Sequence, residues 1–205
     1  MSVSAEDRAR RIKIILFDVD GVLTDGTIWI YPMPVALPDG SLTTKMVEAK
    51  GFSAHDGAGV TLARLGGMKV GIITKRISET VAIRARDLKL EFVYQGQAFK
   101  MQAVRDIVEK EGVALDEIAY VGDDVVDLPV MRKVGLAIAV ANAREQVKAE
   151  AHYVTGHAGG EGAGRDAIEF ILAAKGVLEK CIEASIDEGN PVSSSMDIGK
   201  GGDLK

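Results

Sequence analysis

The sequence predicts an α/β fold in which a mainly parallel β-sheet lies between two layers of helices, a three-layer α/β/α arrangement. Short apolar runs, such as Ile14 to Phe17, alternate along the chain with segments of helical periodicity. Strands that are buried on both faces have continuous apolar runs, and alternation with helices favours parallel pairing through right-handed crossovers. Polar residues follow directly after several of these runs, where open α/β sheets bind their ligands. At 205 residues, the chain is long enough for one such domain.

The remaining composition is that of an ordinary globular protein, with 47% hydrophobic and 27% charged residues. The net charge of −5 and the lack of a basic stripe argue against a nucleic-acid partner. No apolar run approaches the roughly 18 residues of a membrane span, and the first residues are charged, unlike a signal peptide. The lone Cys181 excludes a disulfide framework within the chain. We therefore expect a cytoplasmic protein with no membrane or nucleic-acid partner.

Six strands of the main sheet are expected from short apolar or β-branched runs. They cover residues 12–18, 68–74, 91–94, 118–121, 136–140 and 153–154. Helices are expected where apolar residues recur every three or four positions between those runs. They cover residues 56–66, 78–88 and 99–111, a short segment ending at Val134, a segment from Asn142, and residues 163–184. Asp56 and Ser78 are the predicted N-caps of the first two helices.

One segment interrupts this alternation and predicts a projecting β-hairpin, which we name the flap (about residues 27–52). Residues 27–31 are β-prone and aromatic, residues 32–40 contain three prolines that predict a bend, and residues 41–52 alternate loosely. The aromatic Trp29 either packs within the hairpin or, with its apolar neighbours, covers a neighbouring subunit or the active site.

Three parts of the chain are expected on this basis. Residues 1–11 form an N-terminal extension, and residues 12–184 form a single domain that includes the flap. Residues 185–205 are rich in Gly and Ser, have little apolar surface to bury, and predict a flexible tail or one ordered against another subunit.

The end of the first strand carries two carboxylates two residues apart, Asp18 and Asp20, in a turn bracketed by Gly21 and Gly26. Two acids so close repel each other unless one is protonated or a cation lies between them. Mg²⁺ suits such a site because it binds a few carboxylates and keeps several waters or phosphate oxygens. A carboxylate can also attack phosphorus to form an aspartyl-phosphate. The turn is therefore a candidate phosphoryl-transfer site, and the alternative is a solvated turn or a helix cap.

Other predicted strand ends carry polar groups as well. Thr74 ends one strand, Lys100 begins a helix, and Asp123, Asp124 and Asp127 follow another strand. Singly, these residues would be a turn hydroxyl, a solvated lysine and a helix cap. Together they would supply a hydrogen-bond donor, a positive charge and metal ligands around a phosphate group.

In this order, the residues resemble the four motifs of the haloacid dehalogenase superfamily of phosphotransferases. The matching positions are Asp18-Val-Asp-Gly-Val22, Thr74, Lys100 and Gly122-Asp-Asp-Val-Val-Asp127. The resemblance covers about residues 12–175 and implies a Rossmann-like sheet and Mg²⁺ as cofactor. It implies Asp18 as nucleophile and Asp20 as general acid and base, with Thr74 and Lys100 on the phosphoryl oxygens. The implied metal ligands are Asp18, Asp20 through its carbonyl, and Asp123, with Asp124 in support.

A narrower resemblance is to the 3-deoxy-D-manno-octulosonate 8-phosphate phosphatases. It is carried by Asp18 to Gly26 and by Gly71-Ile-Ile-Thr-Lys-Arg76, Tyr94-Gln-Gly-Gln97, Tyr120-Val-Gly-Asp-Asp124, Asp127-Leu-Pro-Val-Met131 and Gly159-Gly-Glu-Gly-Ala-Gly-Arg165. That branch lacks a separate cap domain, and no insertion of domain size interrupts the motifs here. The resemblance implies hydrolysis of this sugar-acid phosphate in lipopolysaccharide precursor synthesis. It also implies a homotetramer, in which flaps and C-terminal segments contact neighbouring active sites.

A substrate with both a phosphate and a carboxylate requires more cations than Lys100, and arginine suits a carboxylate. The implied substrate contacts are Asp20, Ser53, His55, Asp56, Gly57, Thr61, Arg76, Arg84, Lys100 and Arg165. Three positions depart from the branch. His55 stands where the branch typically has arginine, Lys75 replaces a usual glycine, and Thr61 occupies a position that can carry arginine. These departures concern substrate recognition, so the particular sugar is left open.

Other functions remain open at this point. The nearest is a phosphatase for a related nononate or sialic acid 9-phosphate. Another is an accessory subunit of a phenylphosphate carboxylase-like complex, although every catalytic position is filled. A phospho-receiver module also combines acids, a threonine and a lysine, but its phosphorylated aspartate ends a middle strand, where this chain has Thr74.

Overall fold

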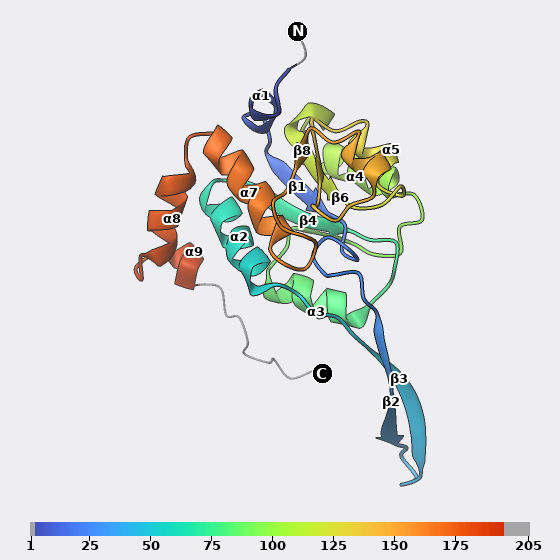
Figure 1. The fold of residues 1–205 in the computed structure, drawn as a ribbon. Coiled ribbons are helices and arrows are strands. Elements are labelled where there is room, and N and C mark those ends of the chain that lie inside the picture. Colours follow the sequence, from blue (N-terminus) through green and yellow to red (C-terminus); the bar gives the residue numbers. More distant parts are fainter. Residues whose placement is uncertain (1–2, 195–205) are drawn as a thin grey trace.

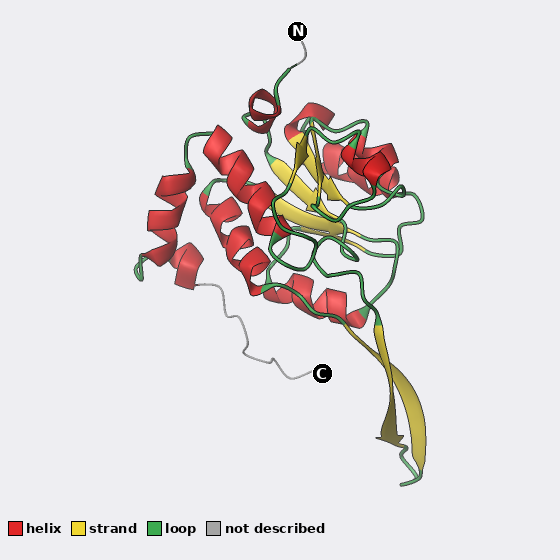
Figure 2. Cartoon of the chain, viewed as in Figure 1, coloured by secondary structure: helices red, strands yellow, loops and turns green. Residues whose placement is uncertain are grey.

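The computed structural model describes residues 3–194 and shows the predicted sandwich of a sheet between helices (Figures 1 and 2). The six-stranded sheet has the order β5-β4-β1-β6-β7-β8, and every neighbouring pair is parallel. Its strands are β1 (Ile14–Phe17), β4 (Lys69–Ile73), β5 (Phe92–Tyr94), β6 (Ile118–Gly122), β7 (Leu136–Ala139) and β8 (Tyr153–Val154). The expected fold class is confirmed.

Helices cover both faces of the sheet, with α2 and α7 on one face and α4 and α5 on the other (Figure 1). The helices within residues 3–194 are α1 (Ala5–Ala9), α2 (Ala54–Leu65), α3 (Glu79–Asp87), α4 (Lys100–Glu111), α5 (Leu128–Met131), α6 (Glu145–Lys148), α7 (Ala163–Ala174), α8 (Leu178–Ile186) and α9 (Pro191–Ser194). A short 3₁₀ turn at Leu115–Glu117 precedes β6. The helical layers bury both faces of the parallel sheet, as such sheets require.

Strand β1 lies at the centre of the sheet and is buried along its whole length. It pairs with β4 on one side and β6 on the other, so that Phe17 is level with Ile72 and Val121. Because all three strands run parallel, the residues that follow them emerge at the same edge of the sheet. This register brings together the polar strand ends that the sequence singles out.

The predicted helix over residues 163–184 is in fact two helices. Helix α7 ends at Ala174 and α8 begins at Leu178, with Gly176 between them at a φ of +71°. A left-handed residue ends a helix, and glycine adopts that conformation without steric cost. The helix predicted from Asn142 begins later than expected, at Glu145, and ends at Lys148.

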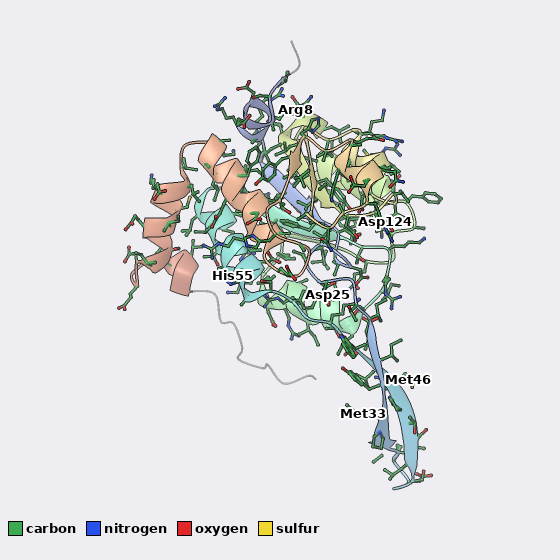
Figure 3. All side chains as sticks on the ribbon, in the orientation of Figure 1. Arg8, Asp25, Met33, Met46, His55 and Asp124 are labelled. Atoms are coloured by element: carbon green, nitrogen blue, oxygen red, sulfur yellow. The ribbon has the colours of Figure 1, made fainter. Side chains whose placement is uncertain are left out.

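The flap consists of β2 (Trp29–Ala36) and β3 (Leu42–Ala49), which pair antiparallel and project from the body (Figure 1). The expected bend at residues 32–40 is wrong in its extent, because β2 continues through Pro32 and Pro34 to Ala36. Each flap strand has a single partner, so a proline, which lacks an N–H, can face the unpaired side. Met33 and Met46 lie about midway along this hairpin (Figure 3).

The ends of the described chain pack against the body. Ala9 of α1 and Ile12 are fully buried, so the N-terminal extension contributes to the core. Helix α9 lies against α2 and α8, while residues 195–205 of the expected tail lie outside the described part of the chain. Among residues 3–194, no helix has both the length and the apolar character needed to cross a membrane.

Candidate active site

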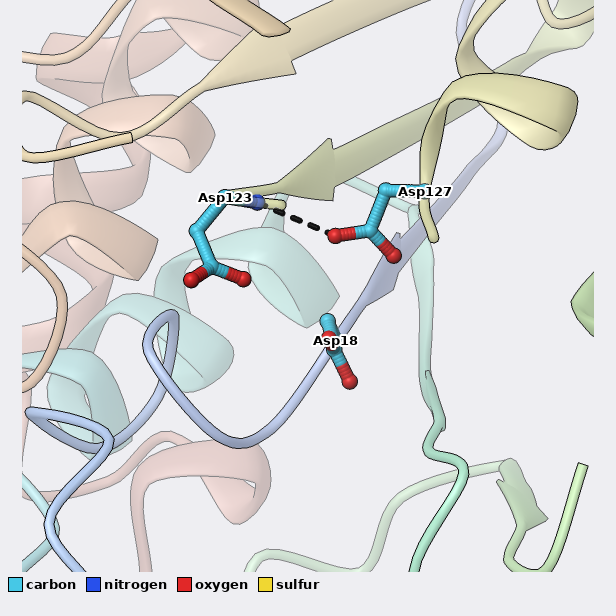
Figure 4. A group of neighbouring side chains, drawn as sticks. All are labelled: Asp18, Asp123 and Asp127. Carbon is cyan, nitrogen blue, oxygen red and sulfur yellow. Dashed lines mark hydrogen bonds between the residues drawn. The ribbon is translucent and has the colours of Figure 1, made fainter. Parts of the chain in front are cut away.

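Three carboxylates meet at the ends of β1 and β6. Asp18 follows β1, Asp123 follows β6, and Asp127 is the residue before α5. Each offers an oxygen, and these oxygens lie within 4.8 Å of one another (Figure 4). Asp127 also accepts hydrogen bonds from the Asp123 amide at 3.0 Å and the Asp124 amide at 3.4 Å, which fixes the loop between β6 and α5.

The ammonium of Lys100 lies between two of these acids. Its Nζ is 2.7 Å from Asp18 Oδ2 and 2.7 Å from Asp127 Oδ1, and it donates a hydrogen bond to the Tyr120 hydroxyl oxygen at 3.1 Å. Tyr120 in turn donates its O–H to Asp127 at 2.8 Å. Lysine is rarely buried unless it is paired, yet the Lys100 side chain is only 3% exposed. The first residue of α4 is therefore an inward-facing charge.

Burial and mutual repulsion shift the pKa values of this cluster. Burial raises the pKa of Asp18 to about 6, against the opposing charge of Lys100. Burial, followed by the charges of Asp127 and Asp18, raises the pKa of Asp123 to about 7. Burial alone would lower the pKa of Lys100, but Asp18 and Asp127 raise it above its usual value. Burial also raises the pKa of Tyr120 far above its usual value, so that this residue stays a hydrogen-bond donor.

These residues fit a divalent cation. Three carboxylates face a single ammonium, and the buried Oδ1 of Asp123 has no hydrogen-bond partner within residues 3–194. A buried charged oxygen without a partner is costly, and hard cations such as Mg²⁺ bind carboxylate oxygens. Each oxygen of Asp127 already accepts from two donors, Oδ1 from Lys100 and Tyr120 and Oδ2 from two backbone amides, so Asp18 and Asp123 are the acids best placed to bind the ion.

Two glycines allow the loops around this cluster to approach closely. Gly21 has a φ of +88°, and a Cβ at this position would lie 2.2 Å from Asp123 Oδ2. A Cβ on Gly159 would lie 1.8 Å from the Gly21 carbonyl oxygen. The loop before α7 therefore lies directly on the turn that carries Asp20, although the two are far apart in sequence.

The other predicted catalytic residues lie at neighbouring strand ends. Thr74 follows β4, is buried, and is held by the bond from its amide to the Tyr94 carbonyl at 2.9 Å. Asp20 forms a short ion pair with Lys50, and its Oδ2 is 3.7 Å from Arg76 Nε. The carboxylates of Asp20 and Asp124 are not part of the group of three acids. Their expected parts in metal binding stay predictions.

The predicted N-cap of α2 is wrong, and the structure gives Asp56 a different place. Helix α2 begins at Ala54, and the Ser53 hydroxyl accepts a bond from the His55 amide at 3.2 Å. Asp56 is one turn further on, where its Oδ1 accepts a bond from the Arg165 amide at 2.9 Å, in the first turn of α7. A carboxylate at a helix N-terminus satisfies free amides and the helix dipole. Asp56 thus joins α2 to the start of α7.

Around this junction lie other residues expected to bind substrate. His55 and Arg165 line an open hollow of about 250 Å³. Its lining residues are His55, His157, Glu161, Gly162, Arg165, Asp166 and Glu169. Arg165 Nε is 2.6 Å from Glu169 Oε1. The acid cluster contributes no residue to the lining of this hollow.

Gly57 and Thr61 are residues of α2, and Arg84 of α3 contacts the start of that helix. Arg84 donates to the Ser53 carbonyl at 3.3 Å, and its buried Nε has no partner among the described residues. Gly57 leaves room for this guanidinium, since a Cβ there would be 3.0 Å from an Arg84 nitrogen. Thr61 is buried within α2. An arginine with an unused donor remains available for an anionic group.

Asp127 belongs to the fourth motif of the sequence, but only Asp123 and Asp124 of that motif are predicted as metal ligands, whereas the structure puts the Asp127 carboxylate in the acid cluster. Two further residues of the site escape the sequence analysis. Tyr120 lies on a strand that the sequence predicts to be buried in the core, and only the structure shows that its hydroxyl accepts a hydrogen bond from Lys100. Lys50 lies at the root of the flap, 30 residues from its partner Asp20, with no local motif to mark it.

Comparison with known proteins identifies the family. A family model described as haloacid dehalogenase-like hydrolase matches residues 71–164. The 3-deoxy-D-manno-octulosonate 8-phosphate phosphatase KdsC of Escherichia coli (strain B / BL21-DE3) is 38% identical over 186 residues, covering 91% of this chain and 93% of that protein. The chain belongs to the haloacid dehalogenase-like hydrolases, in the KdsC phosphatase branch. It is an enzyme of the phosphoric monoester hydrolase class, as the motifs predict.

Solved structures agree with this assignment. A 3-deoxy-D-manno-octulosonate 8-phosphate phosphatase from Moraxella catarrhalis, in complex with magnesium, phosphate and KDO, has a TM-score of 0.76 at 35% identity, covering 87% of this chain and 96% of that one. The phosphatase from Yersinia pestis has a TM-score of 0.75 at 36% identity, with 85% and 88% covered. The predicted family is thereby confirmed over most of the chain.

Asp56 makes the stability of this fold depend on pH. Burial raises its pKa from 3.8 to about 6, so below pH 4 both folded and unfolded chains hold the proton, and between pH 4 and 6 only the folded chain does. Its contribution to stability is therefore full below pH 4 and is lost as the pH rises through 6. Asp56→Asn keeps an acceptor for the Arg165 amide and does not titrate. The stability of this variant relative to wild type should rise by up to about 3 kcal/mol from pH 4 to pH 7.

Urea unfolding at a series of pH values measures this difference. Asp25→Asn, a change of the same kind at an exposed site, is the control, and its unfolding free energy should change with pH as that of wild type does. If the unfolding free energy of Asp56→Asn also changed with pH as that of wild type does, the assignment of a buried, proton-binding Asp56 would be contradicted.

Proposed function

We propose that the enzyme hydrolyses 3-deoxy-D-manno-octulosonate 8-phosphate to Kdo and phosphate through an aspartyl-phosphate on Asp18. The observation that supports this proposal best is the buried Asp18–Lys100–Asp127 arrangement at the end of β1. A nucleophilic carboxylate must be accessible to phosphorus and fixed in orientation, and Lys100 supplies both fixation and a positive charge for the incoming phosphate. The similarity to KdsC phosphatases over most of the chain supports the choice of substrate.

In the first half-reaction, an oxygen of Asp18 attacks phosphorus and the bond from phosphorus to the sugar oxygen breaks. Asp20 gives its proton to that sugar oxygen as it leaves. Thr74 and Lys100 hold the phosphoryl oxygens, one by its hydroxyl and the other by its charge. Lys100 also reduces the repulsion between the ionised Asp18 and the phosphate dianion.

In the second half-reaction, water attacks the phosphorus of the aspartyl-phosphate. Asp20, now ionised, takes a proton from that water, and the bond from phosphorus to Asp18 breaks. Inorganic phosphate leaves and Asp18 is regenerated, so that atoms and charge balance over the cycle. Tyr120 and Asp127 hold the Lys100 ammonium in place throughout.

Mg²⁺ is the cofactor, and Asp18 and Asp123 would hold it, with the Asp20 carbonyl and Asp124 in support. When bound, the ion neutralises the carboxylates and stabilises the negative charge that develops on the phosphoryl group. For the sugar carboxylate, Arg76, Arg84 and Arg165 are the candidate partners, because a guanidinium binds carboxylates with two parallel hydrogen bonds. His55, Ser53 and Thr61 would complete recognition of the sugar.

A second copy of this chain would complete the site, since the flap exposes more apolar surface than a monomer usually does. Trp29 is 55% exposed, Ile30 57% and Leu42 74%, all on the hairpin. The resemblance to the cap-less branch favours a homotetramer in which each flap covers a neighbouring active site. His55 and Arg165, which line the hollow at the start of α7, would then contact substrate at an interface.

Phosphate release from a panel of esters tests the proposed reaction. The panel contains 3-deoxy-D-manno-octulosonate 8-phosphate, nine-carbon sialic and nononic acid 9-phosphates, simple sugar phosphates and p-nitrophenyl phosphate, each with Mg²⁺ and with a chelator. We expect the eight-carbon substrate to have the highest kcat/KM, and the chelator to abolish release. Asp18→Asn should reduce turnover by at least about 10⁴-fold, because it removes the nucleophile.

A preference for a nine-carbon acid would keep the mechanism and replace the substrate. Release from Asp18→Asn at the wild-type rate would contradict the aspartyl-phosphate mechanism, and no release from any ester would favour an accessory subunit. Asp25→Asn, outside the acid cluster, serves as the matched control and should retain turnover.

The flap makes a separate prediction about assembly. The double variant Ile30→Lys, Met46→Lys places charges on both strands of the exposed apolar surface. We expect wild type to sediment as an oligomer and the variant as a monomer at equal concentration, because burying two unpaired charges is costly. The control is Val3→Lys, at a position that is 51% exposed ahead of α1, a helix at the far end of the molecule from the flap (Figure 1). A monomeric wild type, or a variant with unchanged mass, would contradict the role of the flap.

A further inference from the structure

A closed ring of four charged side chains joins the root of the flap to Asp20, and we propose that Lys50, a member of this ring, positions Asp20 for proton transfer. We name this group the flap-root ring, and its members are Asp20, Lys50, Glu48 and Arg76. The inference rests on the proposed phosphatase reaction, in which Asp20 exchanges a proton with the leaving oxygen and with water. It assigns a task to a lysine that belongs to none of the motifs of the sequence.

The charges alternate in sign around the flap-root ring. Lys50 forms a short ion pair with Asp20 Oδ1, and its Nζ is 3.8 Å from Glu48 Oε1. Arg76 is 2.7 Å from Glu48 Oε2, and its Nε is 3.7 Å from Asp20 Oδ2. Each cation therefore lies between the two carboxylates, and each carboxylate lies between the two cations.

Lys50 is the least exposed member of the flap-root ring. Its side chain is 0% exposed, whereas the side chains of Asp20 and Glu48 are 22% and 20% exposed. A pair of exposed charges contributes little because water competes for both partners, but a buried ammonium remains buried only when it is paired. The contact between Lys50 and Asp20 is thus a fixed feature of the fold.

The rest of the protein holds the flap-root ring in place. Lys50 comes directly after β3, and Glu48 lies on β3 opposite Ile30 of β2. The Ser78 hydroxyl donates to Glu48 Oε1 at 2.5 Å, and the Thr80 hydroxyl donates to the Glu48 carbonyl at 3.1 Å. The start of α3 therefore anchors the strand that delivers Lys50 to Asp20.

This arrangement gives the two oxygens of Asp20 different surroundings. Oδ1 accepts the charge-assisted hydrogen bond from Lys50. Oδ2 lies 3.7 Å from Arg76 Nε, beyond hydrogen-bond distance, and accepts no hydrogen bond from the residues that the structure describes. A carboxylate fixed by one oxygen keeps the other in a single orientation, which proton transfer to a particular atom requires. Lys50 acts through Asp20 and itself exchanges no proton with the substrate.

Comparing the cleavage of two phosphate esters distinguishes a role of Lys50 in positioning Asp20 from a role in substrate binding. The two esters are similar in size and neither has a carboxylate. Phenyl phosphate releases phenol, a much weaker acid than the p-nitrophenol released by p-nitrophenyl phosphate, so its cleavage depends more on a proton from Asp20. The measured quantity is kcat/KM for each ester, which reports the steps up to cleavage of the ester bond. The ratio of the two values for one enzyme sample does not depend on the fraction of folded protein.

We expect Lys50→Met to lower kcat/KM for phenyl phosphate roughly tenfold more than for p-nitrophenyl phosphate, as a partial loss of general acid catalysis should. Asp20→Asn should show the same selectivity, and adding Lys50→Met to it should bring no further selective loss. Lys50→Arg, which keeps a donor and a charge, should restore most of the ratio. Lys45→Met is the matched control, because Lys45 lies on β3, the strand that leads to Lys50, is exposed, and forms no ion pair within residues 3–194. It should leave the ratio unchanged.

Equal losses for the two esters in Lys50→Met would overturn the proposal, since a merely structural or substrate-binding lysine would affect both alike. A further selective loss in the Asp20→Asn background would overturn it as well. Wild-type enzyme that cleaves neither ester nor any member of the phosphate panel would instead refute the proposed function, and the role of Lys50 with it. The two failures are therefore distinguishable by the wild-type measurement.

Discussion

The buried contact between the Lys100 ammonium and the carboxylates of Asp18 and Asp127 is the constraint on which the site depends. A charge so far from water requires partners, and the partners come from two strands and a helix that meet at one edge of the sheet. The parallel register of β1 and β6 brings those elements together. Beside this contact, Asp123 has a buried oxygen with no hydrogen-bond partner in the described part of the chain, which is where a divalent cation fits.

A second constraint is the close approach of loops that have no regular structure. Gly159 rests on the Gly21 carbonyl, and Asp56 holds the first turn of α7, so the loop before α7 is fixed at both of its ends. The flap is fixed at its root by Glu48 and Lys50 while its strands project outward. In the proposed mechanism, the sheet would therefore carry the reacting groups, and the surrounding segments would carry recognition and proton transfer.

The sequence was sufficient to predict the sheet, its helical layers and the acids at its edge, because buried parallel strands have continuous apolar runs and their ends are marked by Asp, Thr and Gly. It failed where one residue has two local interpretations. Asp56 has the features of an N-cap for its own helix, yet it caps a helix more than 100 residues later. Lys50 belongs to no motif, and the motif that contains Tyr120 does not reveal the role of its hydroxyl, because the partners of both residues are brought near by tertiary packing. Pro32 and Pro34 predicted a bend, but a two-stranded ribbon leaves room for proline on its open side.

Direct detection of a phosphorylated Asp18 tests the central claim. Enzyme turning over a phosphate ester with Mg²⁺ is quenched rapidly in acid, digested, and analysed by mass spectrometry for peptides that have gained one phosphoryl group. The account predicts one such peptide, with the modification on Asp18, and its loss in Asp18→Asn. Rapid phosphate release with an unmodified Asp18 peptide, or a phosphoryl group on another residue, would contradict it.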